Sequence, residues 1–396
     1  MNLFLIFLSF SISQPDFLVC DAPTKFAPKP EGYTLYSQIT YLRHGMRTPM
    51  NSWFSKGQSG YWICDDNYAE SPPIFLGRGL NNVTRRYHQV LNPRYTEFPL
   101  NCRPGDLIVR GMHQHALLGQ AFRKHLIDDY HFLSDNYNSS EIEVTAGTIE
   151  RTQRSAISFL SNLYPPQTQN EEIVMTTGSD TLEFLYPDQT ECAELNETWN
   201  EFILTDTFKS RQQDAYNLYY YLFEKYNITW DTSTWMFLGD ILASFSCNDI
   251  ELPDDTITDE IFNQSFKNMA FFSYGWYGLK KGVAASPIFR HMLNGLLSQL
   301  NGSSSVKFRL VSGHDSTIIA FLTSFGYYDD YVPPFASHLD VEIWEKDEEK
   351  FVRLCLNGEV IIPPDLQYKD GLIPWEDFFA KCTEYSHFCL EFKKTF

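Results

Sequence analysis

Three short segments of the chain have the residue pattern of buried strands. Residues 34–42 (TLYSQITYL) are rich in β-branched and aromatic side chains, and residues 306–311 (VKFRLV) are mostly apolar. Residues 141–145 (EIEVT) have the same character over a shorter length. Each segment is therefore predicted to be a strand.

Apolar residues recur at helical spacing between and after these strands. Residues 112–126 and 149–163 each carry such a stripe, and residues 318–325 carry another that ends just before a glycine. Ser286-Pro287 suits the start of a further helix, because proline is tolerated in a first helical turn. Strands that alternate with helices predict an α/β fold, here a three-layer core with a mainly parallel sheet.

The rest of the pattern divides the chain into a core and an insertion. We expect the α/β core to comprise residues 30–165 and 290–396, and a mostly helical cap to occupy residues 166–289, where apolar stripes recur at helical spacing. Residues 51–102 are irregular and rich in Gly, Pro, Asn and Trp. We expect them to form a long excursion near the active site.

The N-terminus has the build of a signal peptide. An apolar run from Leu3 to Phe10 is too short to cross a bilayer and is followed by small residues. We therefore expect residues 1–20 to be a signal peptide, cleaved after Ser13 or later, near Cys20; the alternative is a buried terminal strand. No later run of about 20 apolar residues follows, so we expect no stable membrane span and a secreted or lumenal protein.

Cysteines and glycosylation sequons agree with export. The chain has eight cysteines and no C-x-x-C pair, which disfavours zinc and favours disulfides. The disulfide candidates are Cys64, Cys102, Cys192, Cys247, Cys355, Cys382 and Cys389, with Cys20 beside the predicted cleavage region. The sequons N-x-S/T lie at Asn82, Asn138, Asn196, Asn227, Asn263 and Asn301.

The charge of the chain restricts its partners. The formal net charge is −19 and the sequence pI is about 4.9. Such an acidic surface repels a phosphate backbone, so we expect no nucleic-acid partner. Clustered basic residues are correspondingly informative in this chain.

One such cluster follows the first predicted strand directly. Arg43, His44, Gly45 and Arg47 lie within residues 43–49 (RHGMRTP). Guanidinium groups bind a phosphate dianion bidentately, and an imidazole held neutral by nearby cations is a competent nucleophile. The strand at 306–311 is followed closely by a second histidine, His314, and by Asp315. Because binding sites of such sheets lie at the carboxyl ends of parallel strands, we expect both motifs to lie at the same site.

The two histidine motifs resemble those of a known enzyme family. Residues 43–49 fit the R-H-G-x-R-x-P signature of the histidine acid phosphatases, and residues 313–317 (GHDST) resemble the distal His-Asp motif of that family. The similarity continues through residues 105–115, 150–152, 164–166 and 333–337, in the order of the family. It covers most of the mature chain and resembles the branch of the prostatic and lysosomal enzymes.

The resemblance implies a role for each motif residue. It implies hydrolysis of phosphate monoesters through a phosphohistidine, without a metal or other cofactor. In these roles His44 is the nucleophile, Asp315 is the general acid, and the phosphate-binding residues are Arg43, Arg47, Arg151 and His314. The substrate expected is a phosphate monoester, and the oligomeric state stays open, with a homodimer as one option.

The resemblance also suggests disulfide connectivity. By analogy with the family, Cys192 is expected to pair with Cys382 or Cys389. We add the pairs Cys102–Cys355 and Cys64–Cys247, although sequence alone does not determine connectivity.

Several departures from the family pattern affect specificity. Residues 145–148 (TAGT) replace the family's R-S-T-D, the C-terminal C-x-x-x-C of some relatives is missing, and the excursion is longer.

We expect the cap and the excursion to set specificity, because the motif residues contact only the phosphoryl group that all monoesters share. We expect several aromatic residues to form a partly aromatic pocket mouth, drawn from Trp53, Tyr61 and Trp62 of the excursion and from Trp230, Trp235 and the many tyrosines of the cap. Because neither segment is notably basic, we favour singly phosphorylated small molecules, sugars or peptides over phytate.

Other functions remain to be weighed against an acid phosphatase. A sugar-phosphate or inositol-phosphate phosphatase of the same family is one, and a catalytically inactive secreted binding glycoprotein is another. A metallophosphatase using His44, His314 and Asp315 as ligands is disfavoured, because three guanidinium groups would repel a divalent cation. Secretion and the aspartate after His314 disfavour a phosphoglycerate-type mutase. A surface salt-bridge cluster is the non-functional interpretation of the motif.

Overall fold

The structure is a computed structural model that describes most of the chain. It describes residues 20–51, 53–54, 62–64, 102–167, 172–178, 185–252 and 254–390, and the backbone of a small hairpin formed by β2 (Tyr68–Glu70) and β3 (Arg86–His88). The predicted signal peptide before Cys20, most of the 51–102 excursion, Tyr61 and the Asn82 sequon lie outside the described residues.

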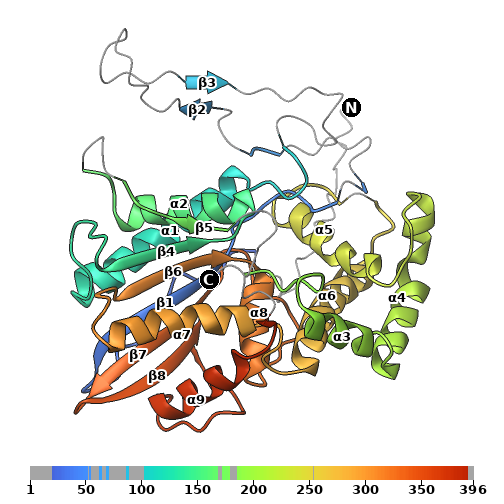
Figure 1. Ribbon diagram of the computed structural model, residues 1–396. Helices are drawn as coiled ribbons and strands as arrows, with labels where there is room; N and C mark the ends of the chain where they lie inside the picture. Colours follow the sequence, from blue (N-terminus) through green and yellow to red (C-terminus); the bar gives the residue numbers. More distant parts are fainter. Residues whose placement is uncertain are drawn as a thin grey trace, which may run out of the picture.

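A mixed sheet organises the molecule (Figure 1). In the described chain it has eight strands in the order β10-β8-β7-β1-β6-β4-β5, with β9 paired to β8. The strands are β1 (Thr34–Arg43), β4 (Ile142–Ala146), β5 (Thr176–Thr177), β6 (Phe308–Gly313), β7 (His338–Lys346), β8 (Glu349–Leu356), β9 (Glu359–Ile361) and β10 (Ile373–Pro374). Strands β5, β4, β6 and β1 are parallel, whereas β7 to β10 pair antiparallel.

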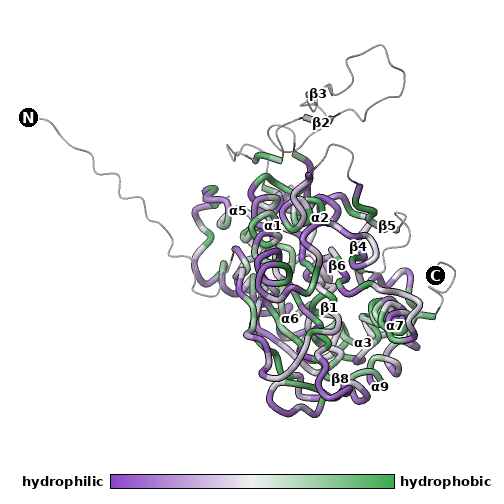
Figure 2. The backbone as a smooth tube through the Cα atoms, turned by 90° about the vertical axis from the view of Figure 1, so that its left-hand side faces the viewer, coloured by the Kyte–Doolittle hydropathy of each residue, from purple (hydrophilic) through white to green (hydrophobic). Residues whose placement is uncertain are grey.

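Helices cover both faces of this sheet. The helices and helical turns of the described residues are α1 (Val109–Phe122), which continues as the π-helical turn η1 (Arg123–Asp129), α2 (Glu150–Leu163), α3 (Ala193–Phe202), α4 (Asp206–Lys225), the 3-10 turn η2 (Thr234–Met236), α5 (Phe237–Ser246), α6 (Asp259–Leu279), α7 (Ser286–Leu300), α8 (Asp315–Ser324) and α9 (Trp375–Tyr385). In the view of Figure 2, β1 and β6 lie between α1 and α2 on one side and α7 on the other.

The alternation of side chains along the strands explains the layers. On one face, Leu42 and Leu310 pack with residues of α1 and α2 in one apolar cluster. On the other face, Tyr41 and Val311 belong to a second cluster that includes residues of α7 and α8 and continues into α3–α6. The predicted α/β class with its three layers is confirmed.

The helices α3 to α6 lie beside the sheet (Figure 1, green to yellow). The long helix α6 packs against α3, α4 and α5, and it also contacts α8, which follows β6. Through that contact α6 lies next to the end of a central strand. None of the helices in the described residues is long and apolar enough to cross a bilayer.

Two of the three predicted disulfide pairings are wrong. The described cysteines form Cys20–Cys247, Cys64–Cys102 and Cys192–Cys389. The bond expected for Cys192 is present, with the second of its two proposed partners. The pairs Cys102–Cys355 and Cys64–Cys247 are not formed, because Cys102 closes the excursion onto Cys64 and Cys247 bonds to the N-terminal Cys20.

The two remaining cysteines are buried and free. Cys355 lies within β8, where its backbone pairs with Asp340 of β7 and Val360 of β9, and Cys382 lies within α9. Burial raises the pKa of both thiols above the ordinary range, so they stay protonated and apolar in character.

Disulfide mapping tests this connectivity. After digestion without reduction, disulfide-linked peptides should contain Cys192 with Cys389 and Cys20 with Cys247. The free Cys355 and Cys382 should react with an alkylating reagent only after the protein is unfolded. Mass spectrometry of the mapped peptides provides the readout. A peptide in which Cys382 is bonded to Cys192 would contradict the connectivity.

Candidate active site

The site begins where two parallel strands end side by side. In the register of β1 with β6, Arg43 lies opposite Gly313, and the His44 backbone N–H donates to the Gly313 carbonyl at 3.0 Å. His44 and His314 therefore follow neighbouring strand ends, and their ring centroids are 5.5 Å apart. The strand arrangement brings together the two motifs singled out in the sequence.

The His44 ring is buried and oriented by the backbone. Its Nδ1 lies 2.8 Å from the carbonyl oxygen of Gly45. A proton on Nδ1 donates to that oxygen and leaves the Nε2 lone pair free. Burial, followed by the charges of Arg151 and Arg47, holds the pKa of His44 well below its ordinary 6.5. The ring is thus neutral at mildly acidic pH.

Close packing at Gly45 brings the loop against α1. A Cβ atom there would lie 2.3 Å from the carbonyl oxygen of Gly111, and one at Gly111 would lie 2.2 Å from that of Met46. Only glycine at both positions permits this approach. The Met46 backbone N–H also donates to Gln114 of α1 at 2.7 Å, which fixes the loop.

Arg43 is held between an aromatic ring and a carboxylate. Its guanidinium carbon lies 4.1 Å from the centroid of the Phe335 ring, and its Nη2 lies 3.0 Å from Oδ2 of Asp315. Nη1 donates to the carbonyl of Pro333. The side chain is buried, so these contacts fix its position.

Arg47 makes a bidentate ion pair with Asp240 of α5. Nη2 donates to Oδ1 at 2.6 Å and Nη1 to Oδ2 at 3.1 Å, and both side chains are buried. The planar guanidinium fork matches a carboxylate in this way. The pair joins the loop after β1 to α5.

Arg151 and His314 complete the group of buried nitrogen-bearing side chains. Arg151 lies in the first turn of α2, and burial followed by the charge of Arg47 lowers its pKa to about 10, so it remains charged. Burial, and then Arg151 and Arg47, holds the pKa of His314 well below 6.5. The Nε atom of Arg151 and Nε2 of His314 are buried and have no partner among the described residues.

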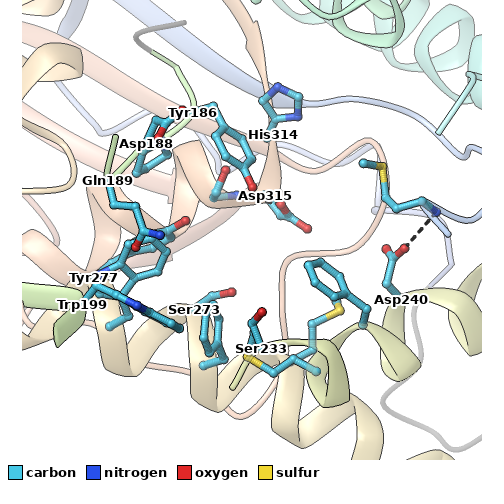
Figure 3. Close-up of a pocket in the computed structure, with 18 of the residues that line it drawn as sticks. Tyr186, Asp188, Gln189, Trp199, Ser233, Asp240, Ser273, Tyr277, His314 and Asp315 are labelled. Atoms are coloured by element: carbon cyan, nitrogen blue, oxygen red, sulfur yellow. Dashed lines mark hydrogen bonds between the residues drawn. The ribbon is translucent and has the colours of Figure 1, made fainter. Parts of the chain in front are cut away.

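A cavity of about 320 Å³ opens in front of these groups (Figure 3). His44, Arg47, Arg151, His314, Asp315 and Asp240 line one part of it. The other part is lined by Tyr186 and Asp188, by Trp199 of α3, and by side chains of η2, α5 and α6. Arg43 lies behind, paired with Asp315, and lines a smaller adjoining cavity. The six predicted catalytic and phosphate-binding residues thus lie around one cavity and its wall.

Sequence comparison identifies the family. The profile of the histidine phosphatase superfamily (branch 2) matches residues 34–221 and 204–357, which is most of the chain. The chain belongs to this family. The family and the relatives described next indicate a phosphatase that acts on phosphate esters.

Several curated proteins are similar over most of their length. Counting factor 60 of Dictyostelium discoideum is 29% identical over 98% of this chain and 94% of its own. Lysophosphatidic acid phosphatase type 6 of Bos taurus is 26% identical over 87% and 82%, and prostatic acid phosphatase of Bos taurus is 25% identical over 68% and 73%. A phytase of Hafnia alvei, solved with tartrate, superposes with a TM-score of 0.60 at 14% identity over 90% of this chain and 98% of its own. This last similarity shows the fold alone.

The structure adds Asp240 to the predicted histidine phosphatase site. The apolar stripe of this segment predicted a helix of the cap, and the carboxylate within the stripe was not singled out as a site residue. A charged residue in so apolar a helix was the available signal, because buried carboxylates are nearly always paired.

The tryptophans expected at the pocket mouth do not line the described part of the cavity, whereas two tyrosines of the proposed cap, Tyr186 and Tyr277, do. Trp53 and Trp230 both pack against Phe223, Trp62 packs against Phe245, and Trp235 is completely buried. None of these four lines the described part of the cavity, and Tyr61 lies outside the described residues. The lining aromatic residues are Tyr186, Trp199, Phe237, Phe272, Trp276 and Tyr277.

The donor set of the cavity does not suit a divalent metal ion. The carboxylates of Asp240 and Asp315 are each paired with a guanidinium, and Arg151 adds a further buried cation. Away from the cavity, the described residues Cys192, Glu194 and Cys389 lie close together, but the two cysteines form a disulfide.

Replacement of Arg151 tests its contact with phosphate. Arg151→Ala should weaken inhibition by inorganic phosphate and lower turnover together, because loss of a charge-assisted donor costs about 1.5–3 kcal/mol, or tenfold to over a hundredfold. Arg154→Ala, one turn further along α2 and outside the described cavity lining, is the matched control. Unchanged phosphate inhibition in Arg151→Ala would show that Arg151 does not bind phosphate.

Proposed function

We propose that this protein is a secreted acid phosphatase that hydrolyses phosphate monoesters through a phosphohistidine at His44. The observation that carries the proposal is a neutral, backbone-oriented imidazole facing a cavity beside buried guanidinium groups. Such a group attracts a phosphate dianion and presents a nucleophile to its phosphorus atom.

The geometry supports a two-step reaction. Arg43, Arg47, Arg151 and His314 hold the phosphoryl oxygens while Nε2 of His44 attacks phosphorus. The bond from phosphorus to the ester oxygen breaks, and protonated Asp315 donates its proton to the departing alcohol. A water molecule then attacks the phosphohistidine, Asp315 takes up its proton, and phosphate and His44 are released.

Asp240 positions Arg47 in this scheme. The carboxylate already occupies both terminal nitrogens of the guanidinium, so Arg47 contributes charge and orientation near the phosphate rather than a free fork. Arg43, Arg47, Arg151 and His314 each keep one buried side-chain nitrogen without a hydrogen-bond partner in the described residues, which supports a role for all four in holding the phosphoryl oxygens.

The pH dependence of turnover tests the acid phosphatase proposal. An ordinary histidine becomes protonated as the pH falls through 6.5 and loses its nucleophilic lone pair, but the pKa of His44 lies well below that value. Turnover of p-nitrophenyl phosphate should therefore be at least as high at pH 5 as at pH 7. No turnover would instead favour an inactive binding glycoprotein, and a maximum at alkaline pH would contradict an acid phosphatase.

The cavity favours a monoester with a single phosphate. It lies between the proposed core, which supplies His44, Arg151 and His314, and the proposed cap, which supplies Asp188 and Asp240. The basic side chains that line its described part are Arg47 and Arg151 alone, apart from the histidines. A polyanion such as phytate would need further cations around its other phosphates. A catalytic efficiency on phytate above that on simple monoesters would favour an inositol-phosphate phosphatase.

Disulfides and sequons support the export part of the proposal. Three disulfides in the described chain suit an oxidising compartment, and the bond to Cys20 is kept in the mature protein only if the signal peptide is cleaved before this residue. Asn196, Asn227 and Asn301 are exposed and available for glycosylation, whereas Asn138 and Asn263 are half-buried.

A further inference from the structure

The cavity has two ends of different chemistry. The end described above holds the histidines and the guanidinium groups. The opposite end is walled by Trp199 of α3 and by Phe272, Trp276 and Tyr277 of α6, which we call the aromatic wall. In Figure 3, Trp199 and Tyr277 lie on the side of the cavity away from Asp240.

Contacts between the rings make the wall rigid. The centroid of Trp199 lies 5.1 Å from that of Trp276 and 5.2 Å from that of Phe272, each with an interplanar angle of 67°. The rings of Phe272 and Trp276 are 5.7 Å apart at 59°. These are favourable distances for edge-to-face pairs, so each ring restricts the other two. Steeply inclined rings form a corner rather than a flat surface.

The charge around this wall excludes a second anionic group. Its polar neighbours in the cavity lining are Asp188, Gln189, Ser233 and Ser273, and no lysine or arginine lines this end in the described residues. A ligand group placed here meets aromatic and methionine side chains with a carboxylate nearby. An uncharged apolar group fits, whereas a carboxylate or a second phosphate would be repelled.

The size of the cavity limits the alcohol. A volume of about 320 Å³ lies at the lower end of the roughly 300–1,000 Å³ typical of small-molecule sites. The phosphoryl group takes part of this volume, and the remainder suits one ring. A long acyl chain would have to extend into solvent.

We propose that the aromatic wall is a leaving-group subsite that selects monoesters whose alcohol carries one uncharged aromatic ring. This inference rests on the proposed function, because it assigns the alcohol side of the same reaction. The ring stays on the departing alcohol and takes no part in the bond changes at phosphorus. Trp199 is the specificity-determining residue most open to test, because it is only half-buried.

Substrates with leaving groups of similar basicity isolate the binding of the ring. Benzyl phosphate and ethyl phosphate both release a weakly acidic alcohol, so the difference between their kcat/KM values reports contacts with the alcohol rather than leaving-group chemistry. We expect kcat/KM for benzyl phosphate to exceed that for ethyl phosphate by about tenfold or more, since a bound ring buries a large apolar area. Equal efficiencies would overturn the proposal.

Variants of Trp199 test whether the preference for benzyl phosphate arises at the aromatic wall. Trp199→Leu should reduce the preference for benzyl over ethyl phosphate about threefold to thirtyfold and leave inhibition by inorganic phosphate within about twofold. Trp199→Phe should restore most of the preference. Trp230→Leu, a half-buried tryptophan outside the described cavity lining, is the matched control and should change neither quantity. An unchanged preference in Trp199→Leu would contradict the subsite.

A binding measurement separates this inference from the proposed function. The non-hydrolysable analogue 2-phenylethylphosphonate should bind about tenfold more tightly than propylphosphonate in calorimetry, whether or not the protein turns over substrate. Tighter binding without any turnover would support the subsite and refute the phosphatase proposal. Turnover of substrate without tighter binding of the aromatic analogue would support the phosphatase proposal and refute the subsite.

A charged isostere tests the alternative that the wall binds a cation, as aromatic faces can. Phosphocholine should be a poorer substrate than its neutral isostere 3,3-dimethylbutyl phosphate. A clear preference for phosphocholine would assign the wall to a cationic alcohol and overturn the proposal.

Discussion

A His44→Ala variant should lose about 10⁴-fold or more of kcat on every monoester, because no other group can take over a covalent nucleophile. The loss should appear with p-nitrophenyl phosphate and with alkyl phosphates alike, since the same attack by His44 displaces either alcohol. Binding of inorganic phosphate should be much less affected, because Arg43, Arg47 and Arg151 remain. The measurement is steady-state turnover together with phosphate binding by calorimetry.

His113→Ala is the matched control for this variant. His113 is exposed on α1, at the surface rather than in the cavity. Its replacement should leave turnover and thermal unfolding unchanged. Turnover of His44→Ala within tenfold of the unmodified protein would remove His44 from the reaction.

An Asp315→Asn variant should slow alkyl phosphates by about 10²–10⁴-fold, the usual contribution of a general acid. The expected loss with p-nitrophenyl phosphate is far smaller, because p-nitrophenolate departs readily without a proton. Asparagine keeps the size of the side chain at the start of α8, but cannot donate an acidic proton. The readout is the dependence of kcat/KM on the pKa of the leaving alcohol, which should be much steeper in the variant.

Loss of the Arg43–Asp315 ion pair is the main confounding effect of this replacement. The pair spans 3.0 Å, and removing one partner can displace the other. Binding of inorganic phosphate monitors the position of Arg43 and should change little. Asp329→Asn, an exposed acidic residue beyond α8, controls for the change in net charge. Equal losses across all leaving groups would assign proton donation to another residue.

The sequence predicted those parts of the site that follow from local patterns. The strands at β1 and β6 were recognisable from short apolar runs, and each carries its motif at its carboxyl end. Parallel pairing then places His44 beside His314, as the register confirms. The antiparallel strands β7 and β8 were not anticipated, because antiparallel pairing depends on partners that no local pattern specifies.

Features that depend on tertiary packing were predicted poorly. The Asp240–Arg47 pair joins residues 193 positions apart, so neither segment alone indicates it. Cys102 bonds to Cys64 across the excursion rather than to Cys355, which pairing of β8 with β7 and β9 holds inside the sheet. Among tryptophans of similar sequence context, packing against α6 brings Trp199 to the cavity, whereas packing against α4 takes Trp230 away from it.

The most direct test of the central claim is to trap the phosphoryl-enzyme. Protein mixed with ³²P-labelled monoester at pH 5 should be quenched within milliseconds under acid-free conditions, since phosphohistidine is labile in acid, and then digested and mapped. We expect label on the peptide that contains His44, and this label should be lost on mild acid treatment and absent from His44→Ala. Label on any other residue, or turnover with no labelled protein in the presteady state, would contradict the central claim.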